Sequence, residues 1–139
     1  MTKLTVETKL DEVYNVLGFL EVIMDEVQIS RQQQIHINTA VEEIFVNIVN
    51  YAFPETAGAV TVCASVNPEK ITIEFCDNGI AFDPVQKETP DISLPLKDRP
   101  IGGLGILMTK EFMDSVKYER IGDENVLTLE KIIKREALP

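Results

Sequence analysis

The sequence predicts an α+β fold, a two-layer sandwich in which a mainly antiparallel sheet is covered on one face by helices. Apolar residues recur at helical spacing over residues 10–28 and 30–53, and shorter segments near the start, middle and end of the chain alternate apolar and polar residues. The later alternating segments come in consecutive pairs joined by short turns, which is typical of antiparallel hairpins. A chain of 139 residues with 45% hydrophobic content suits one core, so we expect a single domain over residues 1–139.

The first three elements are expected to be a strand and two helices. Residues 3–10 alternate like a short strand, and residues 10–28 carry apolar side chains every three or four positions, which indicates a helix. Ser30 is suited to cap a second helix, because its hydroxyl accepts a bond from a free backbone amide. That helix should reach about Phe53, where Pro54 stops it.

A β-hairpin and a long loop are expected in the middle of the chain. Residues 59–67 and 70–77 both alternate and are joined at NPEK, so the hairpin should turn at Pro68 and Glu69. Residues 80–101 contain four prolines and little periodicity. A loop of about twenty residues is uncommon in a compact domain unless it is functional or mobile.

The chain should close with a helix and a second hairpin. The sequence GGLGI opens a helix that is expected to run through about Asp114. Residues 115–122 and 125–134 then alternate, and we expect them to turn at Asp123 and Glu124.

Charge and composition exclude several function classes. The net charge is −10 and the pI is about 4.5, so the protein repels phosphate backbones and anionic lipid, and we expect neither a nucleic-acid nor a membrane partner. The start of the chain lacks the apolar run of a signal peptide, which favours a cytoplasmic protein. Cys63 and Cys76 show no CxxC spacing and histidines are not clustered, so we interpret both cysteines as packed thiols rather than zinc ligands.

Strand parity places Asp77 on the apolar face of the predicted sheet. If the hairpin turns at Pro68 and Glu69, Val60 and Phe75 point to the same side as Asp77, toward the helices. An unpaired carboxylate on that side is costly, so it needs a partner. A bound ligand with donor groups would be one partner, and an Asx turn, in which the carboxylate accepts from its own backbone, is the alternative.

A polar line borders the apolar side of the second predicted helix. Glu43, Asn47 and Asn50 are spaced at i, i+4 and i+7, which puts them on neighbouring turns. A carboxylate and an amide oxygen about one turn apart are suitable for a general base and a magnesium ligand. A solvated helix face would explain the same spacing.

The glycine-rich segment before the last predicted helix is a candidate anion site. Gly102, Gly103 and Gly105 let a backbone approach a ligand closely, and the amides at a helix start favour an anion. The segment matches neither a Walker A loop nor a dinucleotide-binding fingerprint. A hinge or a tight helix entry is the alternative interpretation.

Three motifs, EEIFVNIVNYAF, DNGIAF and GGLGI, occur in a set order along the chain. Together they resemble the N box and the two glycine boxes of the histidine-kinase-like ATPase superfamily, which has the Bergerat ATP-binding fold. The short chain, the lack of a phosphoacceptor helix pair and the ending MDSVKYERIGDENVLTLEK look most like the anti-sigma-factor serine/threonine kinases.

The resemblance assigns the base of the nucleotide to the second motif. Asp77 matches the aspartate that receives the adenine amino group, and Gly79 matches the glycine that lets the base lie close. Thr128 matches a threonine that supports this contact. The cofactors implied are ATP or ADP with Mg²⁺.

The resemblance assigns the phosphates to the other two motifs. Asn47 matches the magnesium ligand, and Glu43 matches the acid that positions or deprotonates the attacking hydroxyl or water. Asn50 lies one turn on, toward the phosphates, and Arg99 is a charge partner for the terminal phosphate. In the family, the end of the loop that forms a lid over the nucleotide holds the phosphates with its backbone amides. This segment matches Gly102, Gly103, Leu104 and Gly105.

Two functions follow from this resemblance. The first is a kinase that phosphorylates a STAS-like antagonist protein and holds a sigma factor in a partner switch, with a homodimer that the apolar first helix and N-terminal strand could support. The second is a module that senses nucleotide and sequesters its partner without phosphorylating it.

Tyr51 departs from the pattern, because many close relatives carry a histidine there, which bears on catalytic rate more than on binding. His36, the only histidine, lies outside the motifs and is interpreted as structural or surface.

Overall fold

The strands and helices follow one another in the expected order in the computed structural model, which describes residues 1–86 and 103–134. The strands are β1 (Thr2–Glu7), β2 (Ala59–Val66), β3 (Lys70–Asp77), β4 (Ser115–Ile121) and β5 (Glu124–Ile132). The α-helices are α1 (Val13–Glu26), α2 (Arg31–Asn47) and α3 (Gly103–Phe112). The shorter turns are η1 (Leu10–Glu12), η2 (Ile48–Ala52) and η3 (Pro84–Gln86).

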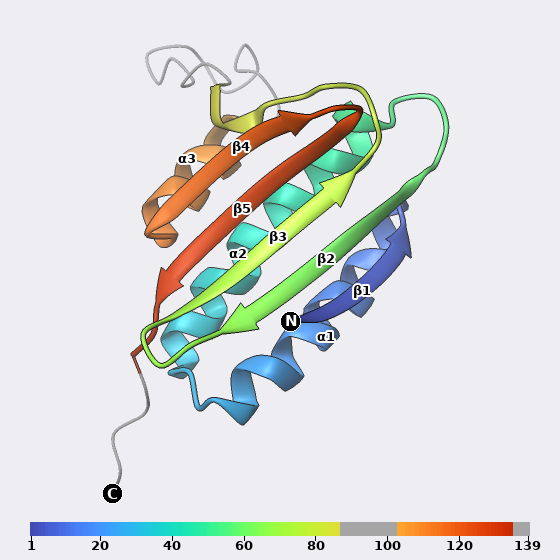
Figure 1. Cartoon of the computed structure of the whole chain (residues 1–139). Helices are drawn as coiled ribbons and strands as arrows, with labels where there is room; N and C mark the ends of the chain where they lie inside the picture. Colours follow the sequence, from blue (N-terminus) through green and yellow to red (C-terminus); the bar gives the residue numbers. More distant parts are fainter. Residues whose placement is uncertain (87–102, 135–139) are drawn as a thin grey trace, which may run out of the picture.

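The sheet has the order β1-β2-β3-β5-β4, and every neighbouring pair is antiparallel. Figure 1 shows α1, α2 and α3 on the same side of this sheet, with α2 running behind its centre. The predicted α+β class, with one covered face, is therefore confirmed.

The predicted register of the first hairpin is confirmed. Val60 pairs with Asp77 and Val62 pairs with Phe75, as a turn at Pro68 requires. Directly opposite residues point to the same face, so this face meets the helices. The largest fully buried side chains come from it and from the helices that cover it, and each stabilises the fold by about 1.5 to 3 kcal/mol; they include Phe75, Ile71, Ile73, Leu129, Leu20, Ile37, Ile44 and Phe45.

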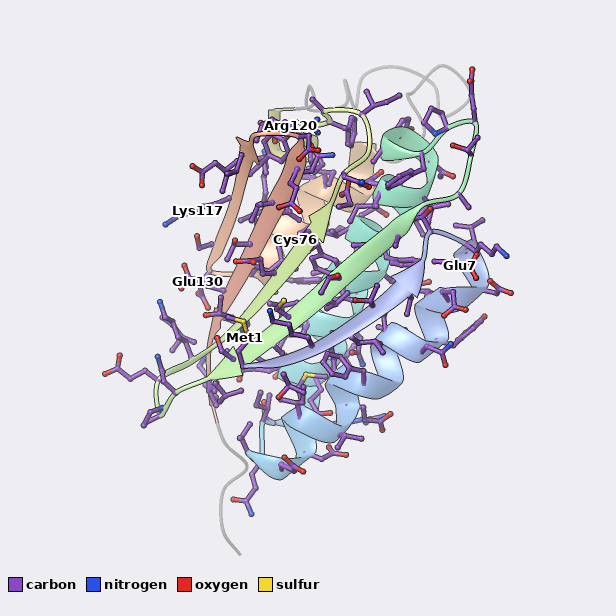
Figure 2. All side chains as sticks on the ribbon, turned by 45° about the vertical axis from the view of Figure 1, so that its right-hand side comes forward. Met1, Glu7, Cys76, Lys117, Arg120 and Glu130 are labelled. Atoms are coloured by element: carbon purple, nitrogen blue, oxygen red, sulfur yellow. The ribbon has the colours of Figure 1, made fainter. Side chains whose placement is uncertain are left out.

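The opposite face of the sheet is polar and open. Figure 2 shows Cys76, Lys117 and Glu130 projecting from it, on three neighbouring strands. Lys70 forms an ion pair with Glu130 across β3 and β5. No helix within residues 1–86 and 103–134 combines the length and apolar character needed to cross a bilayer.

The second helix begins as predicted and ends differently. The Ser30 hydroxyl accepts from the backbone amide of Gln33 at 3.3 Å, so the predicted N-cap is confirmed. Regular α-helix ends at Asn47, and the chain continues as a π-helical turn through Ala52. A π turn holds one residue more than an α turn, so side chains after Asn47 are rotated from their α-helical directions.

The predicted turn of the last hairpin is wrong by one residue. The turn lies at Gly122 and Asp123, because Ile121 and Glu124 already form the last pair of the ladder. Gly122 has φ of +60°, a left-handed conformation that costs glycine little. Residues 87–101 of the predicted loop lie outside the described residues, and α3 ends at Phe112, two residues before the expected Asp114.

Candidate functional site

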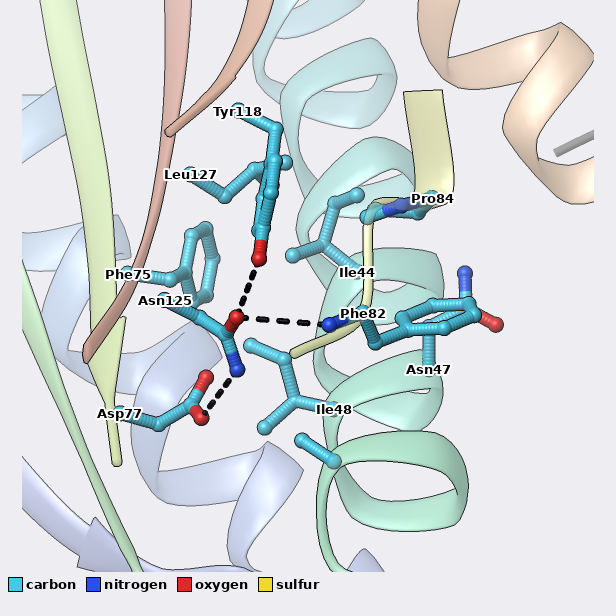
Figure 3. Close-up of a pocket in the computed structure, with 11 residues that line it drawn as sticks. Ile44, Asn47, Ile48, Phe75, Asp77, Phe82, Pro84, Tyr118, Asn125 and Leu127 are labelled. Carbon is cyan, nitrogen blue, oxygen red and sulfur yellow. Dashed lines mark hydrogen bonds between the residues drawn. The ribbon is translucent and has the colours of Figure 1, made fainter. Parts of the chain in front are cut away.

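The candidate site is a small cavity between the end of α2 and the covered face of the sheet (Figure 3). Its volume is about 20 Å³, which is room for one water molecule. Helical residues close one side, strands β3, β4 and β5 close the other, and the segment after β3 lies across it. The lining residues are Ile44, Asn47, Ile48, Ala52, Phe75, Asp77, Phe82, Pro84, Tyr118, Asn125 and Leu127.

Asp77 lies at the wall of this cavity, at the end of β3. The residue is only 5% exposed, and its Oδ1 atom accepts two hydrogen bonds of 2.9 Å, from the Gly79 amide and from Asn125 Nδ2. The bond from Gly79 is the Asx turn that the sequence left as the alternative. Among the described residues none donates to Oδ2, so the turn occupies one carboxylate oxygen and leaves the other available.

Gly79 is required by its packing against the helix end. A Cβ atom at this position would lie 2.4 Å from the Ala52 carbonyl oxygen, which no side chain tolerates. The next residue, Ile80, donates its amide to the same oxygen at 2.9 Å. The glycine therefore holds the segment after β3 against η2, and it lies beside the cavity rather than in its lining.

Asn125 is a site residue that the sequence reasoning missed. It lies directly opposite Asp77 in the β3–β5 ladder and is only 4% exposed. Its Nδ2 atom donates to Asp77 Oδ1 and to the Ile80 carbonyl, both at 2.9 Å. Its Oδ1 atom accepts from three donors, namely Tyr118 Oη, Arg120 Nη1 and the Phe82 amide.

Thr128 does not take the place that the resemblance assigned to it. It pairs with Glu74 on β3 and with Lys117 on β4, so it shares the open face of the sheet with these residues. Asp77 points to the opposite face. Direct support of the Asp77 carboxylate therefore comes from Asn125, three residues earlier on the same strand.

The polar line of α2 is only partly brought to the cavity. Asn47 is 2% exposed and lines the cavity, and its Nδ2 atom donates to Glu43 Oε1 at 3.4 Å. Glu43 is half-buried one turn earlier. Asn50 is exposed within η2 and is not among the lining residues.

Tyr51 packs against the segment that follows Asp77. Its ring stacks on Phe82 with centroids 4.8 Å apart and an interplanar angle of 22°. Phe82 lines the cavity, and Figure 3 shows its ring on the same side as Asn47. Tyr51, at which the sequence departs from the resemblance, thus packs against a residue of the cavity wall.

The glycine segment opens α3, as the sequence predicts. Gly103, Leu104 and Gly105 form the first turn of this helix. Arg99 and Gly102 lie outside the described residues. At the other end of α3, Phe112 stacks on His36 of α2 at a centroid distance of 4.3 Å, which agrees with a structural role for the histidine.

One side-chain oxygen of the site, that of the Asn47 amide, is suited to bind magnesium. Asn47 lines the cavity, and its carbonyl oxygen accepts no hydrogen bond from the described residues. Mg²⁺ keeps most of its water and takes one or two protein oxygens plus phosphate oxygens, so a single amide oxygen suffices. Residues 1–86 and 103–134 hold no cluster of three or more histidine, cysteine or acidic side chains placed to bind a metal.

The chain matches a family model described as the histidine kinase-like ATPase domain over residues 6–131. It is 29% identical to the serine/threonine-protein kinase BtrW of Bordetella bronchiseptica over 126 residues, which cover 90% of this chain and 86% of that protein. It is 30% identical to the serine-protein kinase RsbW of Bacillus mycoides over 129 residues, covering 89% of this chain and 73% of the relative. With the anti-sigma F factor of Clostridium acetobutylicum it shares 29% identity over 83 residues, 60% of this chain and only 58% of that relative.

Two solved structures share the fold. The RsbU and RsbW domains of Rv1364c from Mycobacterium tuberculosis superpose with a TM-score of 0.69 at 14% identity, covering 99% of this chain and 34% of that one. The Acinetobacter baumannii histidine kinase AdeS gives a TM-score of 0.53 at 11% identity, covering 97% of this chain and 70% of the other. At such low identity these likenesses concern the fold alone.

Proposed function

Because the chain belongs to the family of histidine kinase-like ATPase domains, we propose that the cavity beside Asp77 receives the adenine of ATP or ADP, and that the protein is an ATP-dependent serine/threonine kinase of the anti-sigma-factor type. The observation that carries the nucleotide site is the Asp77 carboxylate. It is nearly buried, it is held through one oxygen, and its other oxygen is available at the cavity.

Adenine binding uses this available oxygen. Asp77 Oδ2 accepts from the 6-amino group, while Phe75 and Leu127 provide apolar contact for the base. A volume of about 20 Å³ holds one water but no purine. Nucleotide entry therefore requires Phe82 and Pro84 to move away from the helix, which couples binding to the position of the segment after β3.

Phosphoryl transfer is assigned to the polar residues of α2. Bound Mg²⁺ would offset the charge of the phosphates, which this acidic protein otherwise repels. Asn47 would hold the metal through its carbonyl oxygen. Glu43 orients the Asn47 amide and accepts the proton of the attacking serine or threonine hydroxyl. Asn50 and Arg99 stay predictions from the resemblance, as do the phosphate-binding amides of Gly102, Gly103, Leu104 and Gly105.

The partners we propose are those of a partner switch. Relatives named RsbW and anti-sigma F factor support a protein that phosphorylates an antagonist, STAS-like in our sequence prediction, and that holds a sigma factor. We propose a cytoplasmic location for the same reason, since a protein that holds a sigma factor would work beside RNA polymerase. The predicted homodimer remains part of this proposal.

A module that sequesters its partner without phosphorylating it is the second candidate. The observation that favours it is the Tyr51–Phe82 stack, which replaces an imidazole with a closed aromatic pair at the site. The test is transfer of radiolabelled phosphate from ATP to a candidate antagonist, run beside an assay of partner binding. Labelling of a serine or threonine supports the kinase, whereas partner binding that depends on nucleotide without any labelling supports the sequestering module.

A further inference from the structure

The amide of Asn125 is held in one orientation by five hydrogen bonds. Oδ1 accepts from the Tyr118 hydroxyl and from two groups that can only donate, Arg120 Nη1 and the Phe82 amide. Nδ2 donates to Asp77 Oδ1 and to the Ile80 carbonyl, both of which are acceptors. A flipped amide would oppose donor to donor or acceptor to acceptor at four of these contacts, all except the Tyr118 hydroxyl, which can also accept. The chemistry of the neighbours therefore sets the orientation.

This orientation limits what Asp77 offers to a ligand. A carboxylate oxygen has about two sites for hydrogen-bond donors. On Oδ1 both are taken, one by the Gly79 amide and one by Asn125 Nδ2. Asp77 therefore presents a single acceptor atom, Oδ2, in a plane that its neighbours have already set.

A single acceptor distinguishes the two common purines. Adenine carries an amino donor at position 6, which one oxygen satisfies, whereas guanine carries a carbonyl acceptor there. Guanine's adjacent donors, the ring N1–H and the 2-amino group, match both oxygens of a free carboxylate in a bidentate pair. A carboxylate with one oxygen occupied cannot form that pair.

We propose that Asn125 is a positioning residue that determines the choice of purine: by occupying Asp77 Oδ1 it matches the site to adenine and excludes the bidentate contact that guanine needs. The inference rests on the proposed nucleotide site. It assigns purine selection to two residues on different strands rather than to Asp77 alone.

The test compares ATP and GTP binding by calorimetry in wild type, Asn125→Leu and Asn125→Thr, with melting temperatures measured in parallel. Asn125→Leu removes the donor to Asp77 while keeping a side chain of similar size, so we expect ATP to bind about tenfold more weakly and the ATP-over-GTP preference to fall about tenfold or more. A threonine hydroxyl donates one bond, so Asn125→Thr should give an intermediate preference. Thr128→Val is the matched control on the same strand, because the Thr128 side chain lies on the open face. The ATP-over-GTP preference of this variant should equal that of wild type.

The outcomes separate this inference from the proposed function. Wild-type protein that binds neither nucleotide overturns the nucleotide site itself. A second outcome overturns only the positioning role of Asn125. In it, wild type prefers ATP, and Asn125→Leu melts at a lower temperature yet prefers ATP over GTP by the same factor. Should Asn125→Leu fail to fold, Asn125→Thr decides, because an unchanged preference in that variant also contradicts the inference.

Discussion

Tyr51 and Phe82 form a stacked aromatic pair, with ring centroids 4.8 Å apart, that joins the end of the second helix to the segment after β3. The two residues are far apart in the sequence, and their contact lies at the wall of the cavity that Asp77 also lines. The stack therefore joins the first two motifs beside the cavity that the Asp77 carboxylate lines.

Phe82→Ala should make nucleotide entry faster. The substitution removes a ring that lines the cavity and that must move before a base can enter. We expect faster association of a fluorescent ATP analogue in stopped flow, with a loss of about 1 kcal/mol in unfolding free energy from the lost aromatic pair. Tyr51→Phe keeps the stack and serves as the control. An association rate equal to that of wild type would show that Phe82 does not obstruct the site.

Asp77→Asn should weaken adenine binding while keeping the local turn. The asparagine oxygen still accepts from the Gly79 amide, but its amino group then faces the amino group of adenine. We expect a loss of roughly 2 to 3 kcal/mol in ATP binding, the scale of a hydrogen bond to a charged group. Titration calorimetry on the folded variant measures it. ATP affinity equal to that of wild type would remove Asp77 from the site.

Glu43→Ala should separate binding from transfer. ATP binding should persist, while phosphoryl transfer falls by about 10²- to 10⁴-fold, as expected for loss of a general base. Glu43→Gln is the matched variant, since it keeps an oxygen for the Asn47 amide but cannot take a proton, so it should be equally slow. If Glu43→Gln transfers at the wild-type rate, Glu43 serves only to orient Asn47.

Asn47→Ala should weaken both nucleotide binding and transfer. Asn47 is the one side chain of the polar helix line that lies in the cavity wall, and its carbonyl oxygen is the proposed metal ligand. We therefore expect the effect of Mg²⁺ on ATP affinity to be reduced in this variant, as measured by titration with and without the metal. An undiminished Mg²⁺ effect would place the metal on other groups.

The Cys76 thiol should react slowly with alkylating reagents. Burial, together with a hydrogen bond of 3.2 Å to Glu74 Oε1 and the charge of that carboxylate, raises the pKa of Cys76 to about 12, because each disfavours the thiolate. In a Cys63→Ser background at pH 8, iodoacetamide should react with Cys76 at least about tenfold more slowly than with an unperturbed cysteine. Glu74→Gln removes the charge and should raise the rate. A rate that does not depend on Glu74 would contradict this account.

Local chemistry in the sequence predicted most of the fold. The Ser30 cap and the turn at Pro68 depend on a few adjacent residues, and together they define the start of α2 and the face on which Asp77 lies. The π turn after Asn47 has no comparable local signal, so the sequence did not predict where regular α-helix ends.

The residues across the β3–β5 ladder were harder to predict. These strands are not consecutive in the chain, so no turn fixes their register, and Asn125 could not be matched to Asp77 from the sequence. A signal against Thr128 did exist, because Leu127 and Leu129 on either side of it are both buried and alternate with it. The resemblance outweighed that alternation and assigned the threonine to the wrong face.

The position of the β3–β5 ladder also has a kinetic consequence. Strands β1, β2 and β3 lie within residues 1–77, whereas β4 and β5 lie within residues 115–132. Asp77 and Asn125 therefore meet only when these distant parts of the chain dock. Contacts of such large sequence separation form late, because closing the intervening loop costs entropy first. Recovery of ATP binding during refolding should therefore lag behind formation of the first hairpin, which makes nucleotide affinity a reporter of the last step of assembly.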